Sequence, residues 1–149
     1  MRISKNGIDL IKRFEGYKSK PYLDSGGIPT IGYGNTYYPD GKKVRLNDPS
    51  INESTADILL IDMVRKFESV VESSITSRIN QNQFDALVSF SYNIGGSNFR
   101  KSTLLRKVNI NPNDKTIKDE FQRWNKSNGK VLPGLIRRRD AEWNLFIRK

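Results

Sequence analysis

The stretch that decides how this chain folds runs from Arg13 to Thr36 and reads RFEGYKSKPYLDSGGIPTIGYGNT. Its first residues close an apolar segment with helical periodicity, and Gly16 follows as a residue type that commonly ends helices. From residue 21 to residue 46 the chain is rich in glycine, proline, tyrosine and threonine, which favours a small β-sheet with turns at DSGG and PDGK. The stretch therefore predicts a helix followed by a sheet, as in α+β proteins.

Three polar residues of this stretch, Glu15, Asp24 and Thr30, are suited to acid–base chemistry. Glu15 falls between Ile8 and Ile11 on the apolar arc of its helix, where burial favours the protonated form of a carboxyl group. Asp24 lies at the edge of a glycine-rich turn, where we expect it to be wetter and ionised. Two carboxyl groups in unlike environments indicate a division into acid and base.

Each of these residues also has an ordinary structural explanation when it is taken alone. Glu15 could be a carboxylate near a helix end, paired with lysine or arginine. Asp24 could accept hydrogen bonds from the backbone of its turn, and Thr30 could be a strand residue with no other role. The residues by themselves leave these alternatives open.

The rest of the chain is predicted to be mainly helical. Residues 53–75 carry a broad apolar arc, with Asn52 as a cap, and a helix of this length could join two lobes. Helical periodicity continues in NQFDALVSFSYNIG, NFRKSTLLRKV, IKDEFQRWN and PGLIRRRDAEWNLFIRK, with breaks at Gly95-Gly96 and Asn128-Gly129.

Three consecutive arginines in the last of these segments point in different directions on a helix. Arg139 falls among apolar residues and is predicted to be inward, whereas Arg138 precedes Glu142 by four residues, a spacing that favours an ion pair. Arg137 alone is left on the outside. This pattern favours a structural role over a nucleic-acid patch.

Missing residue types narrow the possible chemistry. The 149 residues include no cysteine and no histidine. Disulfides, thiol nucleophiles, a Ser-His-Asp triad and His-based zinc sites are therefore excluded, so an enzyme with this sequence would use carboxylates, lysines or hydroxyls. With 28% charged and 36% hydrophobic residues, the chain is predicted to be one globular domain.

Positive charge is concentrated in the C-terminal third. Residues 1–100 contain 13 Lys/Arg and 11 Asp/Glu, whereas residues 101–149 contain 13 and 5. An excess of this kind suggests an anionic partner such as nucleic acid, an acidic membrane surface or an acidic glycan, although it also serves solubility. The opening MRISKNGIDL has no apolar run of the length of a signal peptide or anchor, so we expect no membrane anchor.

The order and spacing of Glu15, Asp24 and Thr30 resemble the catalytic Glu–eight–Asp–five–Thr pattern of phage-type lysozymes, the muramidase endolysins of glycoside hydrolase family 24. Four ordered blocks extend the resemblance over nearly the whole chain: NGIDLIKRFEG, YLDSGGIPTIGYGNT, NQFDALVSFSYNIGGSNFRKSTLLRKVN and GLIRRRDAEWNLF. One departure is Asn35, where the family often has histidine. Four blocks in order are more specific than the triplet alone.

The resemblance implies an α+β, lysozyme-like fold in a single domain, residues 1–149. It implies a small N-terminal lobe of residues 13–58 with a three-stranded antiparallel sheet, and a long connecting helix over residues 53–75. Residues 1–12 and 76–149 would form a larger helical lobe.

The implied function is hydrolysis of the β-1,4 bond between N-acetylmuramic acid and N-acetylglucosamine in bacterial peptidoglycan, which causes host cell lysis. Glu15 would be the general acid, with Asp24 and Thr30 positioning a water. No metal, organic cofactor or nucleic acid is implied, and we expect a monomer that stays in the host cytoplasm until a holin releases it. The substrate-binding residues implied by matching position are Tyr33, Asn35, Thr36, Tyr92, Asn93 and Ser102.

Three alternatives remain. A lytic transglycosylase would cleave the same bond with a glutamate acid but without a water, and the presence of Asp24 and Thr30 favours hydrolysis over it. A non-catalytic glycan-binding relative is disfavoured by the intact triplet. A basic nucleic-acid-binding protein would need a continuous basic face, which the scattered charges of the helical segments do not provide.

Overall fold

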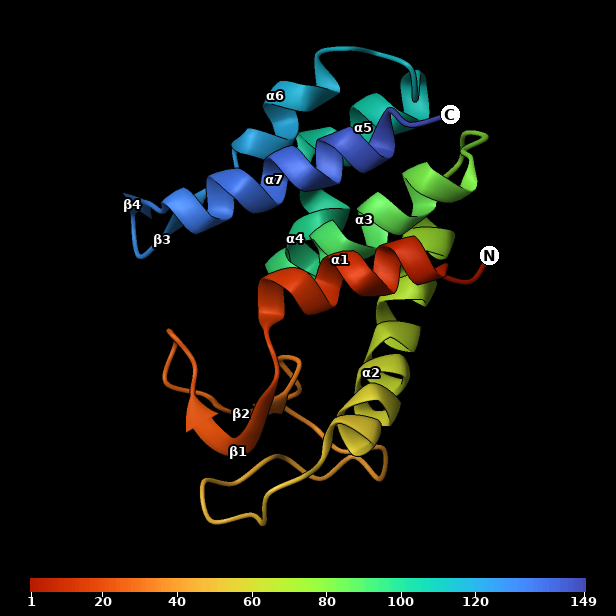
Figure 1. Ribbon diagram of the computed structural model, residues 1–149. Helices are drawn as coiled ribbons and strands as arrows, with labels where there is room; N and C mark the ends of the chain where they lie inside the picture. Colours follow the sequence, from red (N-terminus) through yellow and green to blue (C-terminus); the bar gives the residue numbers. More distant parts are fainter. The chain divides into compact units, whose positions relative to one another are not determined.

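The computed structural model describes residues 1–149, and its fold is α+β (Figure 1). Seven helices and four short strands follow in the order α1, β1, β2, α2 to α6, β3, β4 and α7. The chain divides into two compact units. The first unit combines Met1–Leu10 with Phe67–Lys149, and the second is Ile11–Lys66.

The second unit contains the end of α1 and the first sheet. Helix α1, Lys5–Glu15, ends as predicted, with Gly16 at a positive φ of 72°. Strand β1, Lys18–Leu23, pairs antiparallel with β2, Pro29–Gly32, and the DSGG turn joins them. The predicted helix-then-sheet order is therefore confirmed.

The prediction of a three-stranded sheet in this region is wrong, because the sheet has only two strands. Beyond β2 only the isolated bridges Ile31–Asn35 and Tyr37–Lys43 form. Pro39 has no N–H group to donate to a ladder, and Gly41, at a φ of 88°, turns the chain again. The segment after β2 therefore folds as a succession of turns.

A small hydrophobic core supports this sheet and the loops after it. Its buried members are Ile31, Val44 and Leu59, and Tyr38 and Ile51 pack against them. Leu59 belongs to α2, Glu53–Ser74, which is the long helix predicted over residues 53–75. The predicted cap is also confirmed, since Asn52 Oδ1 accepts a hydrogen bond from the Thr55 backbone N–H at 2.8 Å.

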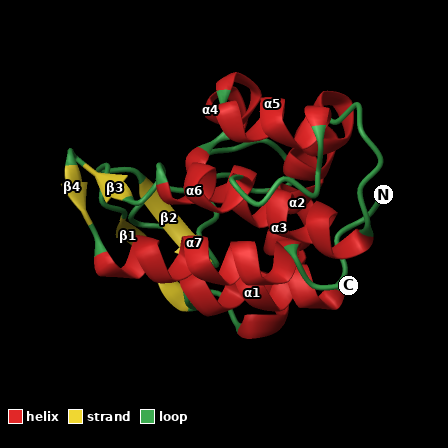
Figure 2. Cartoon of the chain, turned by 90° about the horizontal axis from the view of Figure 1, so that it is seen from above, coloured by secondary structure: helices red, strands yellow, loops and turns green.

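The first unit is built around α3, Gln81–Ile94, whose residues 83–92 are all buried. Helix α7, Pro133–Phe146, packs along it (Figures 1 and 2). Helices α4, Gly96–Lys101, α5, Thr103–Ile110, and α6, Ile117–Gln122, belong to the same unit. Its aromatic core contains edge-to-face and tilted ring pairs and one stacked pair, Trp143 on Phe146. The other rings are Phe90, Phe99, Phe121 and Trp124.

Two details of this unit differ from the periodicity-based prediction. The run NFRKSTLLRKV is divided at Ser102, whose extended backbone (ψ 146°) ends α4 and whose hydroxyl caps α5. The break at Asn128-Gly129 is a hairpin between β3, Lys126–Ser127, and β4, Lys130–Val131 (Figure 2). Asn128 and Gly129 have φ of 52° and 78°, the positive values that a two-residue hairpin turn requires.

None of the seven helices combines the length and the apolar composition needed to cross a bilayer.

Candidate active site

Glu15, the last residue of α1, has its carboxyl group against the backbone of the loop after β2. A Cβ atom built on Gly34 would lie 2.5 Å from Glu15 Oε1 and 3.1 Å from Cδ. Gly34 also has a φ of +84°, which L-residues rarely adopt. The absence of a side chain at Gly34 therefore leaves the space that the Glu15 carboxyl group occupies.

The close approach at Gly34 predicts that Gly34→Ala lowers activity far more than stability. We expect a stability loss of about 1 kcal/mol from the positive φ and a fall in activity of at least about tenfold, because the new methyl group displaces the Glu15 carboxyl group. The matched control is Gly41→Ala, with a similar φ of +88° and nothing within 4 Å. Equal activity losses in the two variants would show that the space around Glu15 is not important.

Asp24 is half-buried at the end of β1 and is held by its own turn. Its Oδ1 accepts hydrogen bonds from the backbone N–H groups of Gly26, at 2.8 Å, and Ile28, at 2.9 Å. Its backbone N–H donates to the Ile28 carbonyl at 3.0 Å. These bonds fix the carboxylate and engage only one of its two oxygens.

Thr30, on β2, is 2% exposed, and its hydroxyl is oriented by the same turn. Oγ1 donates to the Ile28 carbonyl oxygen at 2.8 Å, the oxygen that also accepts from the Asp24 backbone N–H. A hydroxyl group has one proton and two lone pairs. Since the proton is committed to Ile28, Thr30 Oγ1 has only acceptor capacity to offer.

Tyr22 lies within the electrostatic influence of both carboxylates, and the sequence pattern alone does not single it out. It lies opposite Thr30 in the β1–β2 ladder. Burial raises the pKa of Tyr22, and the negative charges of Glu15 and then Asp24 raise it further. Both carboxylates therefore lie in the surroundings of one ring. The available signal was the two-residue step from Tyr22 to Asp24, because alternate residues of a strand share a face.

The three predicted substrate-binding residues of this unit have different environments. Tyr33 is buried, with its ring centroid 5.8 Å from that of Tyr17. Asn35 is 1% exposed, and its Nδ2 donates to the Leu59 carbonyl at 2.8 Å. Thr36 is half-buried beside a hollow of about 380 Å³. The geometry thus favours a structural role for the Asn35 side chain.

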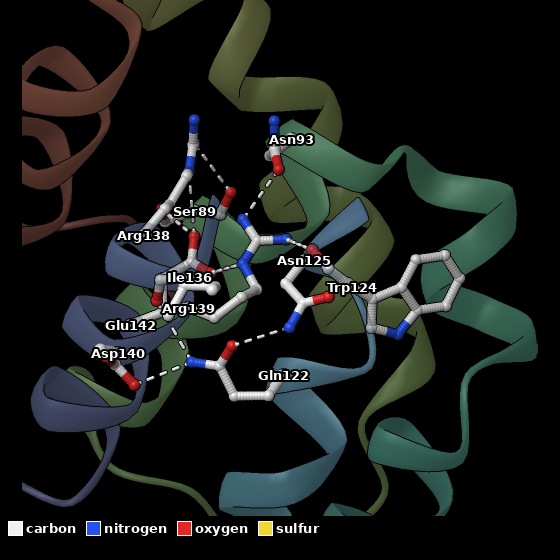
Figure 3. Close-up of polar contacts among 10 residues, drawn as sticks. All are labelled: Ser89, Asn93, Gln122, Trp124, Asn125, Ile136, Arg138, Arg139, Asp140 and Glu142. Atoms are coloured by element: carbon white, nitrogen blue, oxygen red, sulfur yellow. Dashed lines mark hydrogen bonds and ion pairs between the residues drawn. The ribbon is translucent and has the colours of Figure 1, made fainter. Parts of the chain in front are cut away.

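The other three predicted binding residues belong to the first unit. Tyr92 is largely buried and packs edge-to-face on Phe67, with 5.3 Å between ring centroids. Ser102 Oγ donates to the Phe99 carbonyl and accepts from the Leu105 N–H, so its hydroxyl serves helix geometry. Asn93 is exposed, and its Oδ1 accepts from Arg139 Nη2 at 2.8 Å (Figure 3).

The predicted behaviour of the arginine run is confirmed. Arg138 and Arg139 are both buried, and both lie against the buried carboxylate of Glu142. Arg137 is exposed. Two of the three arginines therefore belong to the interior of the first unit.

A carboxyl group at the end of a helix, followed by a small sheet that carries a second carboxyl group and an oriented hydroxyl, is typical of a lysozyme-like glycoside hydrolase. Comparison with known proteins agrees. The family described as phage lysozyme matches residues 12–142. The endolysin of Salmonella phage P22 is 42% identical over 147 residues, which cover 99% of both chains. The endolysin of Bacillus phage B103 is 42% identical over 149 residues, but this chain spans only 54% of its length.

Solved structures show the same relationship. A variant of P22 lysozyme superposes with a TM-score of 0.83 at 39% identity, covering 99% of both chains. The endolysin from Escherichia coli phage FAHEc1 gives a TM-score of 0.89 at 38% identity, covering 99% of this chain and 94% of that one. The chain belongs to the phage lysozyme family of endolysins, which are glycoside hydrolases.

Proposed function

We propose that this protein hydrolyses the β-1,4 bond between N-acetylmuramic acid and N-acetylglucosamine in bacterial peptidoglycan. The observation that carries the proposal is the geometry around the first sheet: Glu15 lies against Gly34, and one turn both fixes the Asp24 carboxylate and orients the Thr30 hydroxyl. Such a pair of carboxyl groups is what glycoside hydrolysis requires.

In the proposed mechanism Glu15 is the general acid. It transfers its proton to the glycosidic oxygen as the bond from that oxygen to the anomeric carbon breaks. Its position against the Gly34 backbone supports this role, because a proton donor must be held within hydrogen-bond reach of the leaving oxygen.

Asp24 and Thr30 are proposed to hold the attacking water. A water that directs a lone pair at the anomeric carbon can donate its two hydrogens to two acceptors. The second oxygen of Asp24 and the lone pairs of Thr30 Oγ1 are suitable, because Asp24 Oδ1 and the Thr30 proton already have backbone partners. The water oxygen bonds to the anomeric carbon, and one of its protons passes to Asp24.

Mass spectrometry of digested peptidoglycan tests the proposed reaction. Hydrolysis gives fragments with reducing ends, and this is the expected result. Anhydro-sugar ends would instead identify a lytic transglycosylase. Intact glycan strands with bound protein would favour a non-catalytic wall-binding relative.

The proposal also includes the setting of the reaction. We propose that residues 1–149 act as a single monomeric lysozyme-like domain and cause host cell lysis. Before lysis the protein would be retained in the host cytoplasm until a holin gives it access to the wall. Deleting the holin gene should then delay lysis without lowering the activity of the purified protein.

The basic C-terminal third predicts that lysis of whole walls depends strongly on salt. We expect wall lysis to fall roughly tenfold between 50 mM and 200 mM salt, because screening weakens attraction between exposed lysines and an anionic polymer. Turbidity assays measure this effect. Cleavage of a short soluble oligosaccharide is the control and should change much less.

Variants that replace two lysines by glutamine test whether the salt dependence arises on the surface of the first unit. Lys115 and Lys118 line a hollow of about 710 Å³ together with Lys149, Trp143 and Phe146. Lys115→Gln with Lys118→Gln should weaken the salt dependence more than Lys18→Gln with Lys20→Gln on β1, which makes the same charge change. Equal salt dependence for the cleavage of walls and of the oligosaccharide would show that this surface does not bind the wall.

A further inference from the structure

The first unit contains a buried ionic cluster, formed by Arg138, Arg139, Glu142 and Ser89 (Figure 3). Glu142 is fully buried, and its Oε2 accepts from Ser89 Oγ at 2.6 Å and lies 3.3 Å from Arg138 Nε. Its Oε1 lies 2.8 Å from Arg139 Nε, an ion-pair contact rather than a well-aligned hydrogen bond. A buried charge without a partner is costly, so these contacts hold the charged side chains of the cluster in fixed positions.

Arg139 is held on several sides within this cluster. Its Nε faces Glu142, its Nη1 donates to the Trp124 carbonyl at 3.3 Å, and its guanidinium carbon lies 5.0 Å from the Phe90 ring centroid. The side chain is 0% exposed. The remaining nitrogen, Nη2, donates to Asn93 Oδ1 at 2.8 Å. A fully buried cation thus has one contact with an exposed amide.

This contact decides which way the Asn93 amide faces. An asparagine amide has an oxygen that only accepts and an NH₂ group that only donates, whereas a guanidinium group only donates. The reversed amide would set two donors against each other beside a buried positive charge. Arg139 therefore keeps Oδ1 on the inside and turns the Asn93 NH₂ group away from the cluster.

We propose that Arg139 is a positioning residue, which fixes Asn93 as a hydrogen-bond donor for the carbonyl oxygen of a substrate acetamido group. The inference rests on the proposed function, in which Asn93 contacts the glycan. A sugar hydroxyl can donate or accept, but an acetamido carbonyl oxygen can only accept, so a fixed donor selects it best. The positive charge behind the amide polarises it and strengthens its N–H donors.

Asn93→Asp tests the proposed polarity, because it keeps the shape and removes both N–H donors. The new carboxylate retains an acceptor for Arg139, so we expect the variant to fold with an unchanged or higher Tm. Its outer oxygen would face the substrate carbonyl, and KM for an N-acetylated oligosaccharide should rise by at least about tenfold while kcat changes less than about threefold. Asn144→Asp, on an exposed position of α7, makes the same charge change and should leave KM unaltered.

A KM for Asn93→Asp equal to that of the wild type would overturn the inference. So would a lower KM, because it would mean that the substrate group is a donor. If the wild-type protein cleaves nothing, the proposed function has failed instead. Calorimetric binding of a chitin oligosaccharide to both proteins then still tests the donor role, since loss of affinity in the variant supports it and equal affinity contradicts it.

A double-mutant cycle tests whether Arg139 acts through Asn93. Arg139→Gln alone should raise KM, because the amide is then free to reverse. In the Asn93→Ala background the same change should have no further effect on KM. If the two substitutions instead raise KM by factors that multiply in the double variant, Arg139 does not act through Asn93. If Arg139→Gln does not fold, Asn93→Asp decides alone, because Arg139 keeps its partner in that variant.

Discussion

Replacing Glu15 by glutamine is expected to lower wall lysis by at least about a thousandfold while the protein stays folded. Glutamine keeps the shape and the position against Gly34, but its amide cannot transfer a proton to the leaving oxygen. Removing a carboxylate from a half-buried position also relieves a desolvation cost, so the Tm should not fall. Turbidity clearing and thermal melts measure the two quantities.

A matched control separates this effect from a general loss of negative charge. Glu53, the first residue of α2, is an exposed carboxylate of the same unit. Glu53→Gln should lyse walls at close to the wild-type rate. A folded Glu15→Gln variant that retains more than about one per cent of wild-type lysis would contradict the assignment of Glu15 as the proton donor.

Thr30→Ala is expected to lower kcat by about a hundredfold and to change KM by less than about threefold. The hydroxyl is proposed to hold a water that gains its importance in the transition state, so its loss should affect turnover rather than binding. Thr30→Ser keeps Oγ and its hydrogen bond to the Ile28 carbonyl, and it should recover most of the activity. Steady-state kinetics on a soluble oligosaccharide measure both constants.

The opposite kinetic pattern would count against this role. If Thr30→Ala raises KM and leaves kcat unchanged, Thr30 binds substrate and does not position a water. If Thr30→Ser is as slow as Thr30→Ala, the methyl group matters more than the hydroxyl. Thr55→Ala, on α2, is the control for loss of a threonine in the same unit.

Features set by short-range signals could be predicted from the sequence. Helix α1 ends at Glu15 because Gly16 adopts a positive φ, and α2 begins after Asn52 because that side chain caps it. The buried pair Arg138–Glu142 followed from a four-residue spacing on one helix. In each case the determining contact lies within a few residues, where periodicity and capping rules apply directly.

Features set by competition between local conformations were harder to predict. The third strand does not form because Pro39 and Gly41 favour turns over a ladder, although the residues around them are typical of strands. At Asn128-Gly129 the sequence pattern indicates only a break, since the hairpin strands have two residues each and leave almost no alternating pattern. Pattern length therefore limits the prediction of such small elements.

Roles that depend on burial could not be predicted from chemistry alone. An asparagine and a serine are suitable ligands for sugars, but the Asn35 amide binds a carbonyl 24 residues away and the Ser102 hydroxyl caps a helix. The contact between Arg139 and Asn93 joins residues 46 apart, and no pattern in the sequence predicts it. Tertiary packing decides which polar groups remain available to a ligand.

In the mechanism proposed above, a water held by Asp24 and Thr30 attacks the sugar opposite Glu15. Such an enzyme inverts the configuration at the anomeric carbon, because the water occupies the space that a bonding carboxylate would need. NMR of the first-formed product of a β-1,4-linked oligosaccharide tests this claim most directly. We expect the α-anomer at early times. A β-anomer at early times, or an anhydro-sugar without a reducing end, would contradict it.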